Sequence, residues 1–346
     1  MVRRRRTSRK RKSSDAAGIF LTAFFVLLLG AGLAAWLVFA PFGPETETFV
    51  DLAPGSSASR IGLQLESAGV VRSRFAFDLV RWFKRGTLRA GEYRFDHPAS
   101  LLEVYARIAR GDVFTKAVTF PEGASIFEIA ARLEQAGFGS QQDFLNVQAR
   151  QTALIADLDP GAKSLEGYLF PDTYFFARKS TLAQICATMV RRFRSVAGQL
   201  GLKEDVHRVV TMASLVERET AVDADRPLVA SVFENRLAKH MPLATDPSVI
   251  YGLELEGRWK GTIYKTDLQH ETPYNTYLHA GLPPGPVANP GTRSLRAAMD
   301  PARTDYLYFV ATGTNAQGRS LFAGTLDEHN KNVAGYRHAV KRAGGR

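Results

Sequence analysis

The chain is poor in cysteine, and several features that mark common protein classes are missing from it. One cysteine among 346 residues, Cys186, excludes a disulfide or a cysteine-based metal site within the chain, and its apolar helix-like surroundings predict a core position. His270 and Glu271 lack the second histidine of a zinc-binding helix. Glycine fingerprints of serine hydrolases, P-loop proteins and dinucleotide-binding proteins are absent as well. The sequence therefore predicts no metal and no cofactor.

Charge is missing altogether from residues 18–40, a run of 23 residues. At ~1.5 Å per residue this run spans a hydrocarbon core of ~30 Å as a helix. It is longer than the apolar core of about 7–15 residues in a cleaved signal peptide. A cleaved signal is the alternative, since Val38-Phe39-Ala40 resembles a cleavage site, but we expect a retained transmembrane helix.

Basic residues precede the apolar run and are lacking just after it. The net charge is +11, of which residues 1–17 carry +7 and the remainder +4. No Lys or Arg occurs between residues 41 and 59. The positive-inside rule places residues 1–17 in the cytoplasm as a basic tail. We expect a single-pass membrane protein with the residues beyond about 41 outside the cytoplasm. Nucleic-acid binding conflicts with this topology, because only the tail would meet cytoplasmic nucleic acid.

An internal repeat follows the apolar run. Residues 52–70 align without gaps on residues 120–138. The matched positions include Gly55 with Gly123, Ser57 with Ser125, Ile61 with Ile129, and Gly69 with Gly137. Each copy predicts a strand end, a turn, a serine N-cap, a short amphipathic helix and a glycine stop. We expect a small mixed α/β module over residues 46–138, acting as a spacer or holding glycan.

Residues 139–346 predict a second domain that is rich in helices, so the expected fold class is α+β. Helical periodicity covers residues 141–156, 182–202, 204–220 and 224–240. Residues 273–291 contain five prolines and three glycines, which indicates a functional loop. A strand pair at 306–311 and 320–323 and a helix over 328–342 are expected to close the chain.

One acidic residue falls in the apolar stripe of the helix predicted over residues 204–220. At ~100° per residue, Glu217 lies about 20° from Val206 on the helix surface. A carboxyl among apolar groups has its neutral form favoured and its pKa raised, which suits a general acid near neutral pH. The alternative is a glutamate at the edge of the core, paired with an arginine such as Arg218 or Arg236.

Several motifs occur together in a characteristic order. They are LEGYLFPDTY (165–174), ASLVERET (213–220), VASVFENRL (229–237), TDPSVIYGL (245–253), YNTY (274–277), GLPPGPVANPG (281–291), YLYFVATG (306–313) and FAGTLDEHN (322–330). This set closely resembles the YceG-like endolytic murein transglycosylases, the MltG family. The resemblance spans the whole chain beyond the apolar run. One departure is Ala244, where the family pattern leads us to expect Gln, so a substrate contact by an amide at this position is in doubt.

The resemblance implies an activity and a set of partners. It implies an endolytic enzyme that cleaves the β-1,4 bond between N-acetylmuramic acid and N-acetylglucosamine within nascent peptidoglycan strands. The products would carry 1,6-anhydro ends, and strand length would be limited. The catalytic glutamate of the family motif falls on Glu217, and the small module corresponds to a part described in the family as LysM-like. Penicillin-binding proteins or glycan polymerases are implied as partners.

A lytic transglycosylase needs one carboxyl where a glycoside hydrolase normally uses two. Glu217 would protonate the leaving oxygen and then, as a carboxylate, take the proton of the sugar's own C6 hydroxyl. Around it, Asn275 and Thr276 offer hydrogen bonds to an acetamido sugar, and Tyr274 and Tyr277 offer aromatic faces.

Other residues have both a supporting and a structural interpretation. Asp246 would steady an oxocarbenium-like charge or orient Tyr251, and otherwise forms an Asp-Pro turn. Glu219 projects to a more polar side near Arg208, as a salt-bridge partner or as an acid. Glu166 is a second carboxyl or a helix cap. Asn289, in the proline-rich segment, contacts substrate or forms a turn.

Two other functions fit the sequence. One is a muramidase-type hydrolase with Glu217 as the acid and Asp246 as the second carboxylate. The other is a non-catalytic, membrane-anchored peptidoglycan-binding scaffold that uses the repeated module. An acid on an apolar helix face favours the enzyme.

Overall fold

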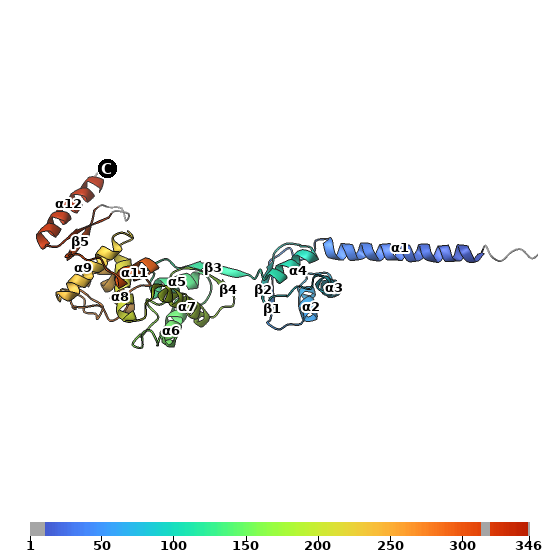
Figure 1. Cartoon of the computed structure of the whole chain (residues 1–346), viewed down its shortest axis with the longest axis horizontal. Helices are drawn as coiled ribbons and strands as arrows, with labels where there is room; N and C mark the ends of the chain where they lie inside the picture. The colour runs from blue at the N-terminus through green and yellow to red at the C-terminus, as the bar shows by residue number, and fades with distance from the viewer. Residues whose placement is uncertain (1–10, 313–318, 345–346) are drawn as a thin grey trace, which may run out of the picture. The chain divides into compact units, whose positions relative to one another are not determined.

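The computed structural model describes residues 11–312 and 319–344, and its contacts divide the chain into two compact units (Figure 1). Unit 1 is Met1–Thr115 and unit 2 is Lys116–Arg346. Both combine helices with small two-stranded sheets, which confirms the α+β class.

Unit 1 begins with the expected long apolar helix. Its elements are α1 (Arg11–Phe39), β1 (Thr48–Leu52), α2 (Ala58–Ser67), α3 (Arg74–Lys84), β2 (Gly91–Phe95) and α4 (Leu101–Arg110). The segment Gly18–Phe39 of α1 has a mean hydropathy of 2.3 and is long and apolar enough to cross a membrane. Strand β1 pairs antiparallel with β2, with Val50 opposite Tyr93. The two strands and helices α2 to α4 enclose one apolar core. Helix α3 is an element that the sequence did not predict.

Unit 2 is built mainly from helices. Its elements are β3 (Thr115–Thr119), α5 (Ile126–Gln135), α6 (Gln141–Arg150), β4 (Thr173–Ala177), α7 (Leu182–Leu200), α8 (Val206–Glu219), α9 (Arg226–Ala238), α10 (Asp246–Leu255), α11 (Thr292–Met299), β5 (Tyr308–Ala311), β6 (Ser320–Ala323) and α12 (Leu326–Gly344), with short 3-10 turns at Thr152–Leu154 and Asp267–Gln269. The helix expected over 141–156 ends at Arg150. Helix α10 begins at Asp246, for which an Asp-Pro turn was one interpretation, because Pro247 in its first turn favours a helix start.

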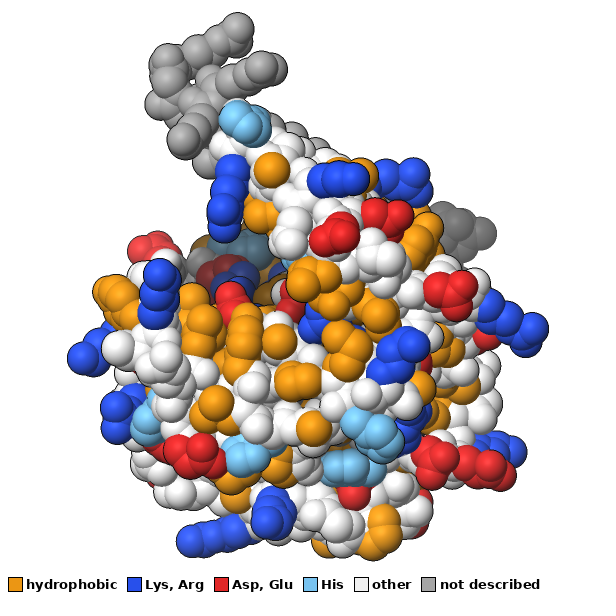
Figure 2. All heavy atoms as spheres, turned by 90° about the vertical axis from the view of Figure 1, so that its left-hand side faces the viewer, with side chains coloured by type: hydrophobic (Ala, Val, Ile, Leu, Met, Phe, Trp, Pro, Cys, Tyr) orange, Lys and Arg blue, Asp and Glu red, His pale blue; other side chains and the backbone are white. Residues whose placement is uncertain are grey.

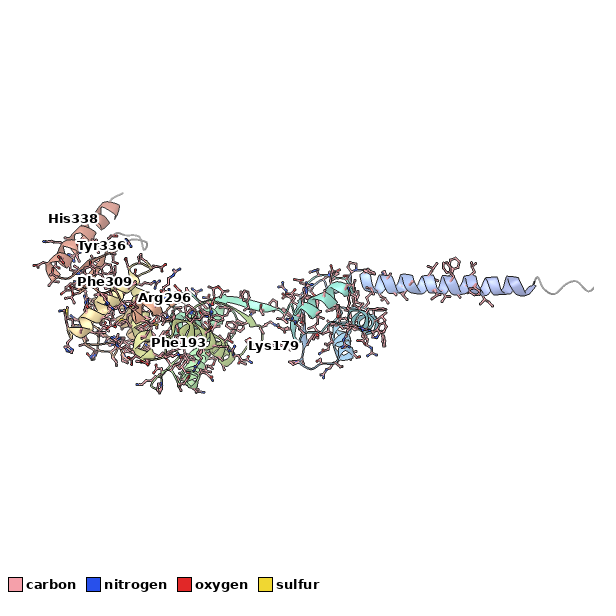
Figure 3. The ribbon with its side chains drawn as sticks, in the orientation of Figure 1. Lys179, Phe193, Arg296, Phe309, Tyr336 and His338 are labelled. Atoms are coloured by element: carbon pink, nitrogen blue, oxygen red, sulfur yellow. The ribbon has the colours of Figure 1, made fainter. Side chains whose placement is uncertain are left out.

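Helix α8 lies at the centre of unit 2. Every residue from 209 to 216 is buried, and α9, α10 and α11 pack against this helix. Phe193 of α7, labelled in Figure 3, packs edge-to-face on Tyr168 with ring centroids 5.1 Å apart. Cys186 is buried as expected, and burial raises the pKa of its thiol to about 12. Helix α8 is therefore a core helix of unit 2.

A hairpin and a helix close unit 2. Strand β5 pairs antiparallel with β6, with Tyr308 opposite Ala323, which confirms the strand pair expected at 306–311 and 320–323. Tyr306 stacks on Phe322 beside it, at 5.6 Å between ring centroids. Figure 2 shows hydrophobic side chains across the middle of one face of unit 2, with Lys and Arg around its edge.

Both copies of the repeat adopt the predicted local structure. A strand leads into a turn, a serine side chain accepts a hydrogen bond from a backbone N–H of the first helical turn, and a glycine ends the unit. Gly55 and Gly123 in the turns have φ of +78° and +79°, and Gly69 and Gly137 after the helices have +68° and +76°. Left-handed backbone at these four positions explains why glycine occupies them in both copies.

The boundary between the units differs from the expected one. The sequence placed both copies in one module over residues 46–138, whereas the contacts divide the chain after Thr115. The physical reason is that Ile126, Ile129 and Leu133 of α5 are buried in the core of unit 2. The second copy is therefore part of the domain that contains α8.

Candidate active site

Three helix ends meet at the carboxyl group of Glu217. Glu217 lies near the C-terminal end of α8, Arg226 is the first residue of α9, and Gly291 immediately precedes α11. The Oε1 atom accepts a hydrogen bond from Nη1 of Arg226 at 2.7 Å, and Oε2 accepts one from the backbone N–H of Gly291 at 2.8 Å. The starts of α9 and α11 add their partial positive charge to these contacts.

The surroundings of Glu217 are less apolar than the sequence predicted. Its side chain is only 4% exposed, as expected from the helix position. Its oxygens, however, contact a guanidinium and a backbone N–H group. The pairing arginine is Arg226 and not Arg218 or Arg236. The sequence pattern located the buried face of α8 but carried no information on which distant arginine reaches it.

Arg226 connects Glu217 to further charged groups. Its side chain is 5% exposed, with Nε 3.4 Å from an oxygen of Asp223 and Nη2 4.0 Å from Oε2 of Glu122. Nη1 also donates to the hydroxyl of Ser294. Asp223 in turn forms an ion pair with Arg293 at 2.6 Å. A buried guanidinium thus holds three carboxylates around one point.

Glu122 is one of the site residues that sequence reasoning missed. It comes from the turn of the second repeat copy, and its side chain is 45% exposed. Burial raises the pKa of Glu122, the negative charge of Glu217 raises it further, and Arg226 and Arg293 oppose both effects. The aligned residue of the first copy is Pro54. Replacement of a turn proline by an acid was the signal available in the sequence.

The turn that carries Glu122 packs directly on Glu217. A Cβ atom added at Gly123 would lie 3.3 Å from Cγ of Glu217, and one added at Gly291 would lie 1.9 Å from Oε1 of Glu122. Arg218 donates to the carbonyl of Gly123 at 3.0 Å. A side chain at Gly291 would displace the end of the Glu122 side chain, and one at Gly123 would displace Glu217 by a few tenths of an ångström.

Glu219 belongs to a separate cluster. The expectation that Glu219 lies on a polar side near Arg208 is wrong. The hydroxyl of Thr245 donates a hydrogen bond to Glu219, and burial raises the pKa of the Glu219 carboxyl. The charge of Asp246 raises this pKa too, while Arg236 lowers it. Arg236 itself donates to backbone carbonyls, among them that of Leu307 at 2.7 Å.

Asp246 and Tyr251 do not contact each other as one interpretation expected. Asp246, in the first turn of α10, accepts a hydrogen bond from the hydroxyl of Tyr277 at 2.6 Å. Tyr251 is buried and hydrogen-bonds to Glu166 instead. Ala244, where Gln was expected, has a left-handed φ of +49° and donates its N–H to the carbonyl of Thr276.

Glu166 and Asn289 form a buried clamp. One oxygen of Glu166 accepts the N–H of Ile126 at the start of α5 at 2.8 Å, and the other accepts from Nδ2 of Asn289 at 2.7 Å. Burial raises the pKa of Glu166 to about 8, although the hydrogen bonds from Ile126 and Tyr251 lower it. Asn289 also donates to Ala124. Both residues hold the second repeat copy in place.

The polar groups of Asn275 and Thr276 are used inside the protein, so the expectation that they offer hydrogen bonds to a sugar is wrong. Asn275 is buried and donates to the carbonyls of Leu268 and His270 at 3.1 and 2.8 Å. The hydroxyl of Thr276 accepts from the N–H of Thr245 at 3.1 Å. They fix the loop before the proline-rich segment.

Tyr274 lies at a second opening of unit 2. Its ring packs on Tyr251 at 5.0 Å between centroids. Together with Glu166 and His207 it lines a pocket of about 230 Å³. Nδ1 of His207 is 2.8 Å from an oxygen of buried Asp159. Over residues 11–312 and 319–344, three or more His, Cys, Asp or Glu side chains nowhere converge as a metal site requires.

Known proteins share this arrangement of sequence and fold. The profile of the family described as YceG-like matches residues 50–335. The chain is 35% identical over 329 residues to the endolytic murein transglycosylase of Bacillus subtilis, covering 88% of this chain and 90% of that protein. It is 30% identical over 321 residues to the endolytic murein transglycosylase of Streptococcus pneumoniae, covering 82% of this chain and 57% of that protein.

A solved structure agrees with the sequence matches. The crystal structure of a YceG-like protein from Listeria monocytogenes superposes with a TM-score of 0.54 at 33% identity, covering 83% of this chain and 99% of that chain. The profile covers well over half of the residues and includes every charged group around Glu217. The chain therefore belongs to the YceG-like family.

Proposed function

We propose that this chain is an endolytic lytic transglycosylase that cleaves the β-1,4 bond between N-acetylmuramic acid and N-acetylglucosamine in peptidoglycan strands. The names of its relatives support the reaction class. The observation that carries the proposal is the buried carboxyl of Glu217, held by Arg226 and Gly291 beside the half-exposed Glu122. In this proposal Glu217 is both the acid and the base.

The charges around Glu217 account for an available proton. Glu122, Glu217 and Asp223 are three carboxylates, and Arg226 and Arg293 are two guanidiniums. One negative charge is in excess, and a single proton neutralises it. Carboxylates that share a site bind a proton as a coupled group. Burial and the negative charge of Glu217 raise the pKa of Glu122, and in this proposal the proton that the first step requires is held between these neighbouring carboxyl groups.

The reaction proceeds in two proton transfers. Protonated Glu217 donates its proton to the glycosidic oxygen, the bond from that oxygen to C1 breaks, and positive charge develops at C1. The Glu217 carboxylate then takes the proton of the C6 hydroxyl while O6 forms a bond to C1. Glu217 ends protonated again, and no water is consumed. Because the nucleophile is part of the same sugar, effective molarity replaces a bound water.

Substrate access is from the side on which the cluster is open. The side chains of Glu122, Asp223 and Arg293 are 45%, 51% and 63% exposed, whereas Glu217 and Arg226 lie beneath them. A glycan strand that crosses this open side would bring a glycosidic oxygen from within the strand, away from its ends, to Glu217. Cleavage at such an internal bond is endolytic.

The charge distribution and the family resemblance support a location at the membrane. We propose that residues 18–40 form a retained single-pass inner-membrane anchor, with the basic tail in the cytoplasm and both units in the periplasm. Nascent glycan strands near the membrane are then the substrate. Coupling to glycan polymerases or penicillin-binding proteins is proposed on the family resemblance alone. Unit 1, with the first repeat copy, acts as a spacer or holds glycan.

The test is a digest of uncrosslinked glycan strands by the wild-type chain and by Glu217→Gln, analysed by mass spectrometry. Glu271→Gln is the matched control, because that side chain is 73% exposed and lies outside the cluster. We expect anhydro-ended products from wild type and control and a rate lower by ~10²–10⁴-fold in Glu217→Gln, the usual contribution of proton transfer.

Each other result contradicts part of the proposal. Products heavier by one water indicate a muramidase, with Glu122 in place of Asp246 as the second carboxylate. Full activity in Glu217→Gln moves the acid to Glu122 or Glu219. No cleavage by any variant, in detergent and in membranes, leaves a peptidoglycan-binding scaffold.

A further inference from the structure

Helix α3 of unit 1 has two apolar faces, and one of them is exposed. Its buried face contributes Phe77 and Val80 to the core of unit 1. The exposed face carries Phe75, Leu79, Trp82 and Phe83, which are 69%, 50%, 65% and 69% exposed. These four positions have the spacing i, i+4, i+7 and i+8, which places them on one side of a helix. Four large apolar side chains together in this way mark a contact surface.

Positive charge borders this exposed face. Residues 74–85 contain four basic residues and one acidic residue. By helical geometry Arg74 and Arg81 lie about 100–120° from Phe75. The guanidinium of Arg74 lies 4.7 Å from the ring centroid of Phe75. An apolar face with Trp and Phe beside Arg and Lys is the composition of a helix that lies in a membrane interface.

Helix α3 is held next to the end of α1. Arg72, two residues before α3, donates to the carbonyls of Ala40 and Pro41 at 2.8 and 3.0 Å. Its guanidinium also lies over the ring of Trp36 at 4.2 Å. Helices α1 and α3 contact each other. Figure 1 shows α3 at the end of unit 1 from which α1 leaves.

We propose that the exposed face of α3 lies on the same lipid bilayer that α1 crosses. Phe75, Leu79, Trp82 and Phe83 enter the boundary between headgroups and acyl chains, and the neighbouring basic side chains contact anionic lipid phosphates. The short connection through Arg72 fixes α3 at the depth where α1 leaves the bilayer. This inference rests on the proposed role of α1 as a retained anchor. It assigns unit 1 a second attachment to the membrane.

The test uses tryptophan fluorescence of the full chain in vesicles of phosphatidylcholine and phosphatidylglycerol. The chain has three tryptophans, Trp36, Trp82 and Trp259, so Trp36→Phe with Trp259→Phe leaves Trp82 as the only reporter. We expect lipids brominated near the carbonyl end of the acyl chain to quench Trp82 more than lipids brominated near the chain end. Adding Leu79→Glu and Phe83→Glu should restore the emission.

A second reporter separates failure of the docking from failure of the anchor. Phe25→Trp, with all native tryptophans changed to Phe, places the only indole in the middle of α1, where deep bromines should quench it. Quenching of this reporter but not of Trp82 overturns the docking and leaves the anchor intact. Absence of quenching at both positions overturns both, while the glycan digest still reports on the enzyme.

Protein concentration distinguishes a lipid surface from a second copy of the chain. Quenching of Trp82 that does not change with the protein-to-lipid ratio supports the bilayer. Unquenched Trp82, combined with energy transfer between labelled copies that increases with this ratio and is lost in Leu79→Glu/Phe83→Glu, assigns the face to a second copy and overturns the proposal. Cleavage of soluble strands should be unchanged in these variants.

Discussion

The two copies of the repeat have the same local structure in different surroundings. In each, a strand, a turn with a left-handed glycine, a serine cap, a helix and a closing glycine follow one another. The first copy has Pro54 at its turn and open space around Gly55, whereas the second has Glu122 there, and its Gly123 packs on Glu217. The repeat thus supplies a scaffold, and a single acid at its turn connects that scaffold to the proposed chemistry.

The helices of the two copies also differ in how they are capped. Ser57 of the first copy is exposed and has Arg60 at the third helical position. Ser125 of the second copy is buried and forms a reciprocal capping box with Glu128. Glu166 caps the same helix from a distant loop. The helix of the second copy is therefore held by more hydrogen bonds than that of the first, and this holds the turn with Glu122 in position.

The largest expected difference between the units is in their response to pH. Burial raises the pKa of Glu166 in unit 2 from an ordinary 4.5 to about 8. Between these values the folded state binds more protons than the unfolded state, so stability is present at low pH and declines as pH rises, by up to about 1.4 kcal/mol per pH unit.

Unit 1 should respond in the opposite direction. A hydrogen bond with His97 lowers the pKa of Asp96, and one with the backbone of Ser100 lowers that of Glu103. The contribution of these two carboxylates to the stability of the folded state is present above the ordinary carboxyl pKa and is lost as pH falls. Hydrogen exchange of peptides from α5 and α4 as a function of pH measures both trends. Glu166→Gln should flatten the trend in α5, and parallel trends in both helices would contradict the comparison.

Substitution of the matched turn residues, Glu122 and Pro54, tests the role of Glu122. Glu122→Gln should lower the rate of strand cleavage by about 10-fold, less than the ~10²–10⁴-fold of a group that transfers the proton itself. The basic limb of the pH–rate profile should move to lower pH, because one negative charge beside the proton is removed. Pro54→Gln, at the matched position of the first copy, should leave rate and profile unchanged. Equal cleavage rates in wild type, Glu122→Gln and Pro54→Gln would show that Glu122 has no role in the reaction.

Alanine at the two turn glycines separates backbone strain from site geometry. Both glycines have nearly the same positive φ, so each substitution should cost about 1–2 kcal/mol of unfolding free energy. A Cβ at Gly55 meets nothing within 4 Å, whereas one at Gly123 meets Glu217. Denaturant unfolding should report both changes, and only Gly123→Ala should also slow strand cleavage. An active Gly123→Ala enzyme would show that Glu217 tolerates displacement.

The smallest expected difference concerns the serine caps. Loss of an N-cap costs about 0.5–2 kcal/mol of unfolding free energy. Ser125→Ala should fall at the upper end, because its capping box is lost with it, and Ser57→Ala at the lower end. Thermal unfolding of the two variants, with local hydrogen exchange to assign each unit, provides the measurement. A larger loss of stability in Ser57→Ala than in Ser125→Ala would contradict the inference that the second copy is the more constrained.

Short-range patterns in the sequence predicted much of the fold. The apolar run, the repeat, the closing strand pair and the burial of Glu217 depend on periodicity and caps, which are local. Helix α3 was missed because both of its sides are apolar. The partners of Glu217 were missed because Arg226 and Gly291 reach it through tertiary packing. Asn275 and Thr276 show the converse, since polar residues in a loop were taken as exposed although their hydrogen bonds are internal.

The spread of the site along the chain has a consequence for biosynthesis. Glu122 comes from the first half of the polypeptide, Glu217 and Arg226 from the middle, and the N–H that holds the second oxygen of Glu217 from Gly291. Because a polypeptide is made from its N-terminus, residues 18–40 and unit 1 are complete before residue 291 has left the ribosome. The proposed anchor is therefore made before the proposed active site is complete, and a chain terminated before residue 291 would lack the N–H that holds the second oxygen of Glu217.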